Sequence, residues 1–285
     1  MHDVLSRAAP APDETVRYGP GPEHVASLWW PRTGEARTAV TVLFLHGGFW
    51  RAAWDRTHAG PLAVALAEAG FTVCAPEFRR TGAGDGGGGG WPGTFDDIAA
   101  AVDTLPGLIS GLGGAPAAAG LVLAGHSAGG HLSLWAAARP RLPAGTPWSA
   151  AGPAPIRGVV ALAAVSDLTA CYAEGLGGGA AGALIGGSPD DYPDRYALAD
   201  PARLLPIGVP AWLRHGALDD RVPAAMSREF AGRARAAGDE VAAQELPGCD
   251  HFDLIDPLSA AWPATCGAFR AAAGRAATAG PGETA

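Results

Sequence analysis

The chain has 285 residues, of which 48% are hydrophobic and 17% are charged, and its formal net charge is −8. These values are ordinary for a globular protein, and the length suits one α/β domain spanning 1–285. They disfavour nucleic-acid binding, which requires a basic face, and the scattered arginines form no membrane-binding patch. No apolar run approaches the roughly 18 residues of a membrane span, and no signal-peptide pattern opens the chain. We therefore expect a cytoplasmic protein with no nucleic-acid or membrane partner.

Strand-like and helix-like segments alternate along the chain. Two opening strands are expected at 15–19 and 25–30. Apolar runs typical of strands follow at 40–45, 71–75, 121–124, 158–165, 211–215 and 241–246. The segments between them predict helices at 58–69, 95–105, 127–138, 224–237 and 257–274. This alternation predicts an α/β fold with a mostly parallel central sheet of about eight strands and helices on both faces.

Glycine and proline mark the expected interruptions. Thr94 is expected to cap the helix at 95–105, and Pro106 is expected to end it. Residues 82–90 are almost all glycine and are expected to form a loop. Residues 167–205 are glycine-rich and less regular, so we expect a small cap inserted there between two units of the sheet.

The segment Gly125-His126-Ser127-Ala128-Gly129 follows an expected strand and opens an expected helix. A G-x-S-x-G segment in that context forms a nucleophile elbow, which exposes its serine hydroxyl above the sheet. The two glycines allow close strand–helix contact, and the helix N-terminus favours developing negative charge. We therefore expect Ser127 to be a nucleophile; a plain Gly/Ser turn is the alternative interpretation.

A serine nucleophile needs a general base and an acid that orients it. Asp219 and His251 follow in the chain order that accompanies such an elbow, each just past an expected strand. Because the carboxyl ends of parallel strands meet at one edge of a sheet, we expect Ser127, Asp219 and His251 to form a triad there. Asp220 is a rival for the acid. The other candidates are expected to be packed, loop or rim residues, namely His58, His126, His131, His215, Asp250 and Asp253.

The loop after the strand at 40–45 contains two consecutive glycines, which let a backbone approach a substrate closely. Acyl transfer needs backbone N–H groups that point at the oxygen of the tetrahedral intermediate. We expect these donors to be the amides of Gly48, Phe49 and Ala128. A simple strand-end turn is the alternative interpretation of the two glycines.

Aromatic residues near this loop and in the expected cap are candidates for substrate binding. They are Trp50, Trp54 and Tyr172. An aromatic wall would suit a flat or apolar substrate. For Trp50 and Trp54 a packing role that anchors the loop is an equally good interpretation.

The HGGFW segment at 46–50 and the GHSAGGHL segment at 125–132 together resemble the α/β-hydrolase superfamily, with a resemblance that extends over 40–270. Within it they are similar to the kynurenine formamidase (arylformamidase) branch and the esterases near it. The resemblance implies the same triad, an oxyanion hole in the HGGFW loop, and hydrolysis of an N-formyl arylamine or a small carboxylic ester without a cofactor. The chain departs from the HGGG segment of hormone-sensitive-lipase-like esterases.

The four cysteines show neither a CxxC pair nor the spacing of metal ligands, so we expect reduced structural thiols and no metal. The expected partner is a small-molecule acyl substrate, and a homodimer is left open. Two other functions also stay open. One is an acyltransferase or thioesterase-like enzyme with the same triad, and the other is a non-catalytic binding protein that keeps the fold.

Overall fold

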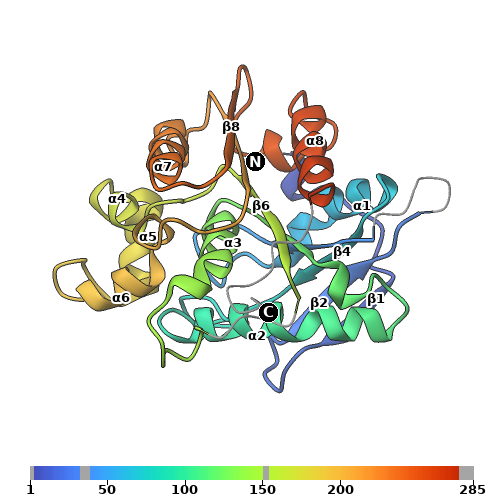
Figure 1. Ribbon diagram of the computed structural model, residues 1–285, viewed down its shortest axis with the longest axis horizontal. Coiled ribbons are helices and arrows are strands. Elements are labelled where there is room, and N and C mark those ends of the chain that lie inside the picture. Colours follow the sequence, from blue (N-terminus) through green and yellow to red (C-terminus); the bar gives the residue numbers. More distant parts are fainter. Residues whose placement is uncertain (1–2, 33–38, 150–153, 276–285) are drawn as a thin grey trace, which may run out of the picture.

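One sheet of eight strands runs through the computed structural model, which describes residues 3–32, 39–149 and 154–275 (Figure 1). The strands are β1 Glu14–Arg17, β2 Val25–Trp29, β3 Thr41–Leu45, β4 Thr72–Pro76, β5 Leu121–His126, β6 Ile156–Leu162, β7 Ala211–Gly216 and β8 Val241–Leu246. Their order across the sheet is β1-β2-β4-β3-β5-β6-β7-β8. The pairs β1–β2 and β2–β4 are antiparallel, and all other pairs are parallel. The predicted sheet, mostly parallel and of about eight strands, is confirmed.

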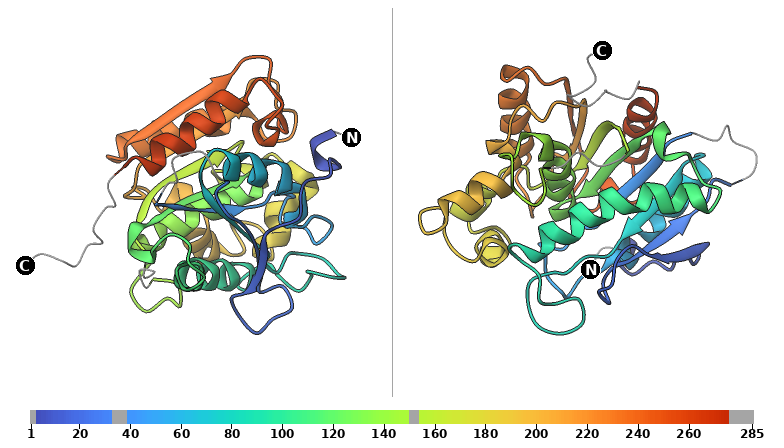
Figure 2. Two further views of the ribbon diagram at one scale, coloured as in Figure 1. Left: turned by 90° about the vertical axis from the view of Figure 1, so that its right-hand side faces the viewer. Right: turned by 60° about the horizontal axis from the view of Figure 1, so that its bottom comes forward.

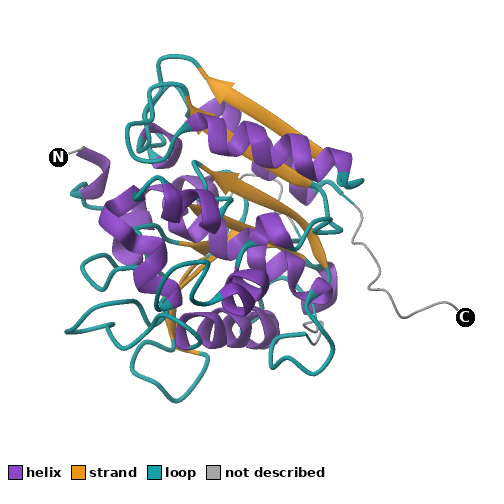
Figure 3. Ribbon diagram, turned by 90° about the vertical axis from the view of Figure 1, so that its left-hand side faces the viewer, coloured by secondary structure: helices purple, strands orange, loops and turns teal. Residues whose placement is uncertain are grey.

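Helices cover both faces of this sheet, as Figures 1 and 3 show. On one face lie α1 (Gly60–Glu68) and α8 (Trp262–Ala273), and on the other lie α2 (Gly93–Gly111), α3 (Ala128–Ala138) and α7 (Ala224–Ala236). Short 3-10 helices occupy the connections at Asp3–Leu5, Arg56–Ala59, Ala117–Ala119, Arg139–Arg141, Pro201–Arg203 and Asp253–Ile255. The predicted cover of helices on both faces is therefore confirmed.

The central strand β3 shows how the sequence builds two cores at once. Successive side chains of a strand point to opposite faces. Leu43 and Leu45 enter the core beneath α2 and α3, whereas Val42 and Phe44 enter the core beneath α1 and α8. All five residues of β3 are buried, which explains why an uninterrupted apolar run forms this strand.

Helix α2 is longer than expected, and the prediction that Pro106 ends it is wrong. The helix continues to Gly111. A proline inside a helix costs about 3 kcal/mol, because it removes a hydrogen bond and crowds the preceding turn. Apolar side chains continue at helical spacing on both sides of the proline, and their burial outweighs that cost. They are Phe95, Ile98, Val102, Leu105 and Ile109.

Thr94 does not cap α2 from outside, because the helix already begins after Pro92. Its hydroxyl instead donates to the carbonyl of Arg79 at 2.7 Å and accepts from the amide of Gly90 at 2.9 Å. The side chain therefore fastens the end of the glycine-rich loop at 82–90 to the segment that follows β4.

The predicted cap region contains three helices: α4 (Leu168–Ala173), α5 (Leu176–Ile185) and α6 (Pro193–Ala199). They contact one another and gather at one end of the molecule, beside α3 and α7 and away from α1 and α8 (Figures 1 and 2). Part of α5 is irregular, since Gly177, Gly178 and Gly179 all have positive φ. Such backbone is open to glycine but costly for other residues, which explains why the sequence pattern here is weak.

Candidate active site

Ser127 occupies a sharp turn between β5 and α3. Its backbone has φ 56° and ψ −118°, a conformation that is strained for any residue with a side chain. The amide of Ser127 donates to the carbonyl of Leu162 at 2.8 Å, and this bond fixes the turn against β6. The structure therefore has the strained strand–turn–helix geometry that the G-x-S-x-G segment predicts.

The glycines on either side of Ser127 are required by close backbone contacts. A Cβ atom added at Gly125 would lie 2.2 Å from the carbonyl oxygen of Gly129. A Cβ atom added at Gly129 would lie 2.0 Å from the carbonyl oxygen of Leu45. Contacts this short with backbone cannot be relieved by moving a side chain, so β5, α3 and β3 can approach only where both positions are glycine.

We expect Gly129→Ala to lower the free energy of unfolding by at least about 3 kcal/mol, because the new methyl group overlaps the backbone of β3. Gly107→Ala is the matched control: Gly107 lies in helix α2, where a Cβ would meet no atom within 4 Å. That change should raise the free energy of unfolding by about 0.5–1 kcal/mol through helix propensity. Urea denaturation of both variants measures the difference; equal stabilities would contradict the packing argument.

Asp219 and His251 lie together at the ends of β7 and β8, as their positions in the sequence predict. The distance between His251 Nδ1 and Asp219 Oδ2 is 2.6 Å, and the Asp219 side chain is 0% exposed. The other carboxylate oxygen accepts from the amides of Arg221 and Val222 at 2.8 and 2.9 Å. The rival Asp220 is 72% exposed and pairs with Arg221 instead.

The Asp219 carboxylate is held in its ionised form. Burial by itself raises the pKa of this group, but the hydrogen bonds from His215 and His251, the charge on His251 and the amide of Val222 together lower it below the ordinary value. An ionised Asp219 requires a proton on His251 Nδ1, which leaves Nε2 of His251 as the nitrogen able to accept a proton.

The imidazole of His251 packs directly against the residue that precedes Ser127. The ring centroids of His126 and His251 are 4.5 Å apart, and His126 Nε2 donates to the carbonyl of His251 at 2.9 Å. Within the described part of the chain, Ser127 Oγ makes no hydrogen bond to His251. Such bonds commonly tighten only when substrate is bound. The structure therefore brings the three predicted residues to the same end of the sheet, after β5, β7 and β8.

His126 and His131 are packed, as the sequence analysis expects. Burial and the charge on His251 lower the pKa of His126 well below its ordinary value, so that its ring stays neutral at neutral pH. His131 Nε2 donates to the carbonyl of Ala199 at 2.9 Å, and burial lowers the pKa of this ring to about 4. Neither ring is suited to take a proton from Ser127.

The loop after β3 has an unusual backbone. Three consecutive residues have positive φ: Gly48 at 113°, Phe49 at 49° and Trp50 at 56°. In the described part of the chain, the amides of Gly48 and Phe49 donate to no backbone or side-chain acceptor. The amide of Ala128 lies in the first turn of α3, where N–H groups lack a partner within the helix. All three predicted donors are thus available to an oxyanion.

A buried hydrogen bond joins His46, the first residue of this loop, to Glu77, and it was not predicted from the sequence. His46 Nε2 lies 2.9 Å from Glu77 Oε1, and His46 Nδ1 lies 2.8 Å from the carbonyl of Gly47. Burial by itself raises the pKa of Glu77. The interactions with His46, with Arg80 and with the amide of Arg56 outweigh burial and lower this pKa to about 2. The sequence feature that could have indicated this pair is Glu77 itself, a carboxylate directly after β4 and at the same edge of the sheet as the elbow.

The three predicted substrate-binding aromatic residues lie in different surroundings. Trp50 is only 1% exposed and meets the edge of His131, which favours the anchoring role that was left open for it. Trp54 is 38% exposed and packs across Gly48, where an added Cβ atom would lie 2.4 Å from Trp54 Cβ. Tyr172 is also 38% exposed, on α4 of the cap.

Two side chains of the loop after β3, Phe49 and Arg51, contact the backbone of α5. The ring of Phe49 lies so close to Gly177 that an added Cβ would come within 2.6 Å of it. Arg51 donates to the carbonyl of Gly177 and, at 3.4 Å, to that of Gly178. The ring of Phe49 therefore packs against α5, which leaves its amide able to face a substrate.

A buried carboxylate in the cap gives a pH-dependent prediction. Asp200 joins α4 to the next turn by accepting from the amide and hydroxyl of Thr169. Burial, and to a smaller extent the charge on Asp167, raises the pKa of Asp200 to about 6. The unfolded chain ionises near the ordinary value of about 4. The free energy of unfolding should therefore fall by about 2–3 kcal/mol as the pH rises from 4 through 6. Asp200→Asn should remove that slope in urea titrations at each pH; an unchanged slope would contradict it.

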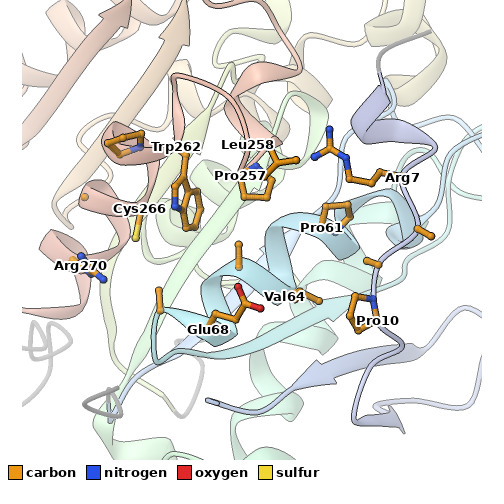
Figure 4. Close-up of a pocket in the computed structure, with 16 residues that line it drawn as sticks. Arg7, Pro10, Pro61, Val64, Glu68, Pro257, Leu258, Trp262, Cys266 and Arg270 are labelled. Carbon is orange, nitrogen blue, oxygen red and sulfur yellow. The ribbon is translucent and has the colours of Figure 1, made fainter. Parts of the chain in front are cut away.

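A separate hollow of about 700 Å³ lies on the face covered by α1 and α8 (Figure 4). The segment at 7–10, Pro61, Val64 and Trp262 line it, and Leu258 at its edge is 79% exposed. None of the triad or oxyanion-loop residues lines this hollow, so it is distinct from the candidate active site.

The described residues offer neither a metal site nor a membrane-spanning helix. No group of three or more His, Cys, Asp or Glu side chains in this part of the chain could hold a metal ion. None of the helices described is both long and apolar enough to cross a membrane. The four cysteines are free and buried.

Sequence comparison identifies relatives that are named as esterases. The chain is 28% identical to Esterase LipQ of Mycobacterium tuberculosis (strain ATCC 25618 / H37Rv), over 84% of this chain and 57% of that protein. It is also 28% identical to the probable carboxylic ester hydrolase LipM of the same organism, over 88% of this chain and 58% of that protein. The chain thus spans less than two thirds of the length of these curated relatives.

Solved structures of similar shape fix the fold. A truncated carbohydrate esterase from gut microbiota matches with a TM-score of 0.75 at 18% identity, over 93% of this chain and 99% of that chain. Esterase B from Lactobacillus rhamnosis, solved with a C4-C4 sn-3 tributyrin phosphonate, matches with a TM-score of 0.73 at 19% identity, over 93% and 88% of the two chains. The chain therefore has the α/β-hydrolase fold.

A family match covers most of the chain. Residues 27–233 match the BD-FAE family, a range that contains the elbow serine and Asp219 but ends before His251. The match thus spans the sheet from β2 to β7 together with the cap. By this extent of agreement, the chain belongs to the BD-FAE family.

Proposed function

We propose that the chain is a serine hydrolase that cleaves small carboxylic esters or aryl formamides through an acyl-serine intermediate. The observation that carries the proposal is the buried Asp219–His251 pair, whose imidazole packs against the residue preceding Ser127. The proposal is also supported by two relatives that are named as esterases. The roles of Ser127, Asp219 and His251 follow from this arrangement as proposals.

The first half of the proposed reaction forms the acyl-enzyme. His251 Nε2 takes the proton of Ser127 Oγ while Oγ attacks the carbonyl carbon of the substrate. Asp219 holds the imidazole with its Nδ1–H toward the carboxylate and stabilises the imidazolium that forms. The amides of Gly48, Phe49 and Ala128 donate to the oxygen that becomes negative. The imidazolium then gives its proton to the leaving alcohol or amine as the bond to the carbonyl carbon breaks.

The second half regenerates the serine. Water enters after the leaving group departs, His251 Nε2 takes one of its protons, and the resulting hydroxide attacks the acyl carbon. The bond from that carbon to Ser127 Oγ breaks, and Oγ recovers a proton from His251. A carboxylic acid, or formic acid from a formamide, leaves the site.

The substrate class is the finer part of the proposal. Trp54, half-exposed beside Gly48, offers an aromatic face where a flat acyl or leaving group could lie. We would compare kcat/KM for an N-formyl arylamine such as N-formylkynurenine with that for short and long p-nitrophenyl esters. A clear preference for the formamide assigns an arylformamidase, and parity or a preference for esters assigns a general esterase. Loss of all these activities in well-folded protein would contradict the proposed function.

A further inference from the structure

A second histidine contacts the carboxylate of the proposed triad. His215 lies at the end of β7, is 2% exposed, and places its Nε2 3.1 Å from Asp219 Oδ2. The same oxygen lies 2.6 Å from Nδ1 of His251. From the sequence alone we expect His215 to be structural, and nothing in its local pattern shows this contact.

Hydrogen bonding fixes which nitrogen of His215 carries the proton. Nε2 faces two acceptors, Asp219 Oδ2 and the carbonyl of Val222, the latter at 2.8 Å. Nδ1 lies 2.7 Å from the hydroxyl of Ser227, which can donate to it. A neutral ring with its proton on Nε2 donates to the carbonyl of Val222 and accepts from Ser227, and the same N–H lies beside Asp219 Oδ2.

The two oxygens of Asp219 are therefore held differently. Oδ1 accepts from the backbone amides of Arg221 and Val222, whereas Oδ2 bonds Nδ1 of His251 and has Nε2 of His215 beside it at 3.1 Å. A donor on a carboxylate withdraws negative charge from it and weakens its attraction for any other cation. The charge that Oδ2 presents to His251 is consequently set in part by His215.

We propose that His215 is a positioning residue that shares Oδ2 of Asp219 with His251 and thereby sets the pH above which His251 serves as a base. This inference rests on the proposed triad. Without the donor, Asp219 would hold the His251 imidazolium more strongly, and the enzyme would require a higher pH to release the base.

Other charged groups around the two histidines are few or paired. His126 of β5 faces His251 and is neutral. The carboxylates near His251 on its own loop are those of Asp250 and Asp253. On the other side of His215 lies a hollow of about 340 Å³ between α7 and β8. Its charged lining residues are Arg228, Arg235 and Glu245. Arg228 pairs with Glu245, and Arg235 donates to the carbonyl of Val241.

The test compares His215→Leu, which has no donor, with His215→Gln, whose amide can donate from a position near that of Nε2. Ala243→Val is the matched control, because Ala243 lines the same hollow without contacting Asp219. The pH profile of kcat/KM is measured on a p-nitrophenyl ester. In His215→Leu we expect the acidic limb to move up by roughly 0.5–1 pH unit, with KM unchanged and the plateau kcat lowered less than tenfold. His215→Gln should restore the limb toward the wild-type pH, and Ala243→Val should not move it.

A measurement on the unaltered protein keeps the test independent of variant folding. In ¹⁵N-labelled protein the His215 Nε2–H resonance should persist across the pH range and shift as His251 titrates. An unmoved limb in folded His215→Leu, or a His215 resonance that ignores the titration of His251, would overturn the inference. If wild-type protein and Ser127→Ala hydrolyse the ester equally, the proposed function fails instead, and the two failures are thereby told apart.

Discussion

Replacing Ser127 with alanine should abolish ester hydrolysis, lowering kcat by a factor on the order of 10³–10⁶, because the members of a triad act as a unit. The same change should remove covalent labelling by an organophosphonate, which attaches to the activated serine oxygen. Intact-mass spectrometry of the labelled protein and initial-rate kinetics measure the two effects. The fold should persist, since the strained backbone at Ser127 does not depend on the hydroxyl group.

Ser133→Ala supplies the matched control for this experiment. Ser133 lies on the same helix, and its hydroxyl donates to the carbonyl of Gly129 at 2.8 Å. This variant should keep both labelling and activity. Labelling that survives in Ser127→Ala, or that disappears in Ser133→Ala with the protein folded, would show that the nucleophile has been assigned to the wrong serine.

Asp219→Asn should lower kcat by about 10⁴-fold while leaving KM within a few-fold. The amide side chain can keep the contacts with the backbone of the loop, but it cannot stabilise an imidazolium and it favours the wrong tautomer of His251. Asp219 is buried and bonded on both oxygens. The neutral asparagine therefore removes the interaction between a carboxylate and Nδ1 of His251. Steady-state kinetics at a pH on the plateau of wild-type activity measures the loss.

The neighbouring residue offers a control for Asp219→Asn. Asp220 is 72% exposed and pairs with Arg221, so Asp220→Asn should leave kcat within about twofold of wild type. Comparable losses from both substitutions would indicate that local charge matters more than the hydrogen bond to His251. That result would contradict the assignment of Asp219 as the acid.

The buried ionisable groups around the candidate site differ in their protonation. Carboxylates buried near the oxyanion loop and the triad, Glu77 and Asp219, are kept ionised by histidine, arginine and amide donors. Burial and the charge on His251 lower the pKa of His126 and outweigh its hydrogen bond to the carbonyl of His251 and the charge on Asp219, so this ring is kept neutral. One end of the sheet thus holds two ionised carboxylates beside a neutral His126, and the hydrogen bond to Asp219 orients the ring of His251.

Local sequence patterns determined the strands, the elbow and the chain order of the triad. Short apolar runs predict buried strands because both faces of such a strand are covered, and β8 agrees with its predicted range, 241–246, at both ends. The Gly-x-Ser-x-Gly segment marks its own turn, since Gly125 must admit the carbonyl of Gly129 only four residues later. These features depend on neighbours along the chain, and a sequence shows them directly.

Tertiary contacts decided the rest. Adjacent aspartates at 219 and 220 have the same local pattern, and only the turn after β7 buries one of them against His251. The Glu77–His46 pair and the contact of His215 with Asp219 join side chains whose bonding partners depend on how strands and loops pack. Pro106 stays inside its helix because α2 buries apolar residues on both sides of it. Burial and partner choice are properties of the assembled sheet, because electrostatic and packing energies depend on distances that no linear pattern specifies.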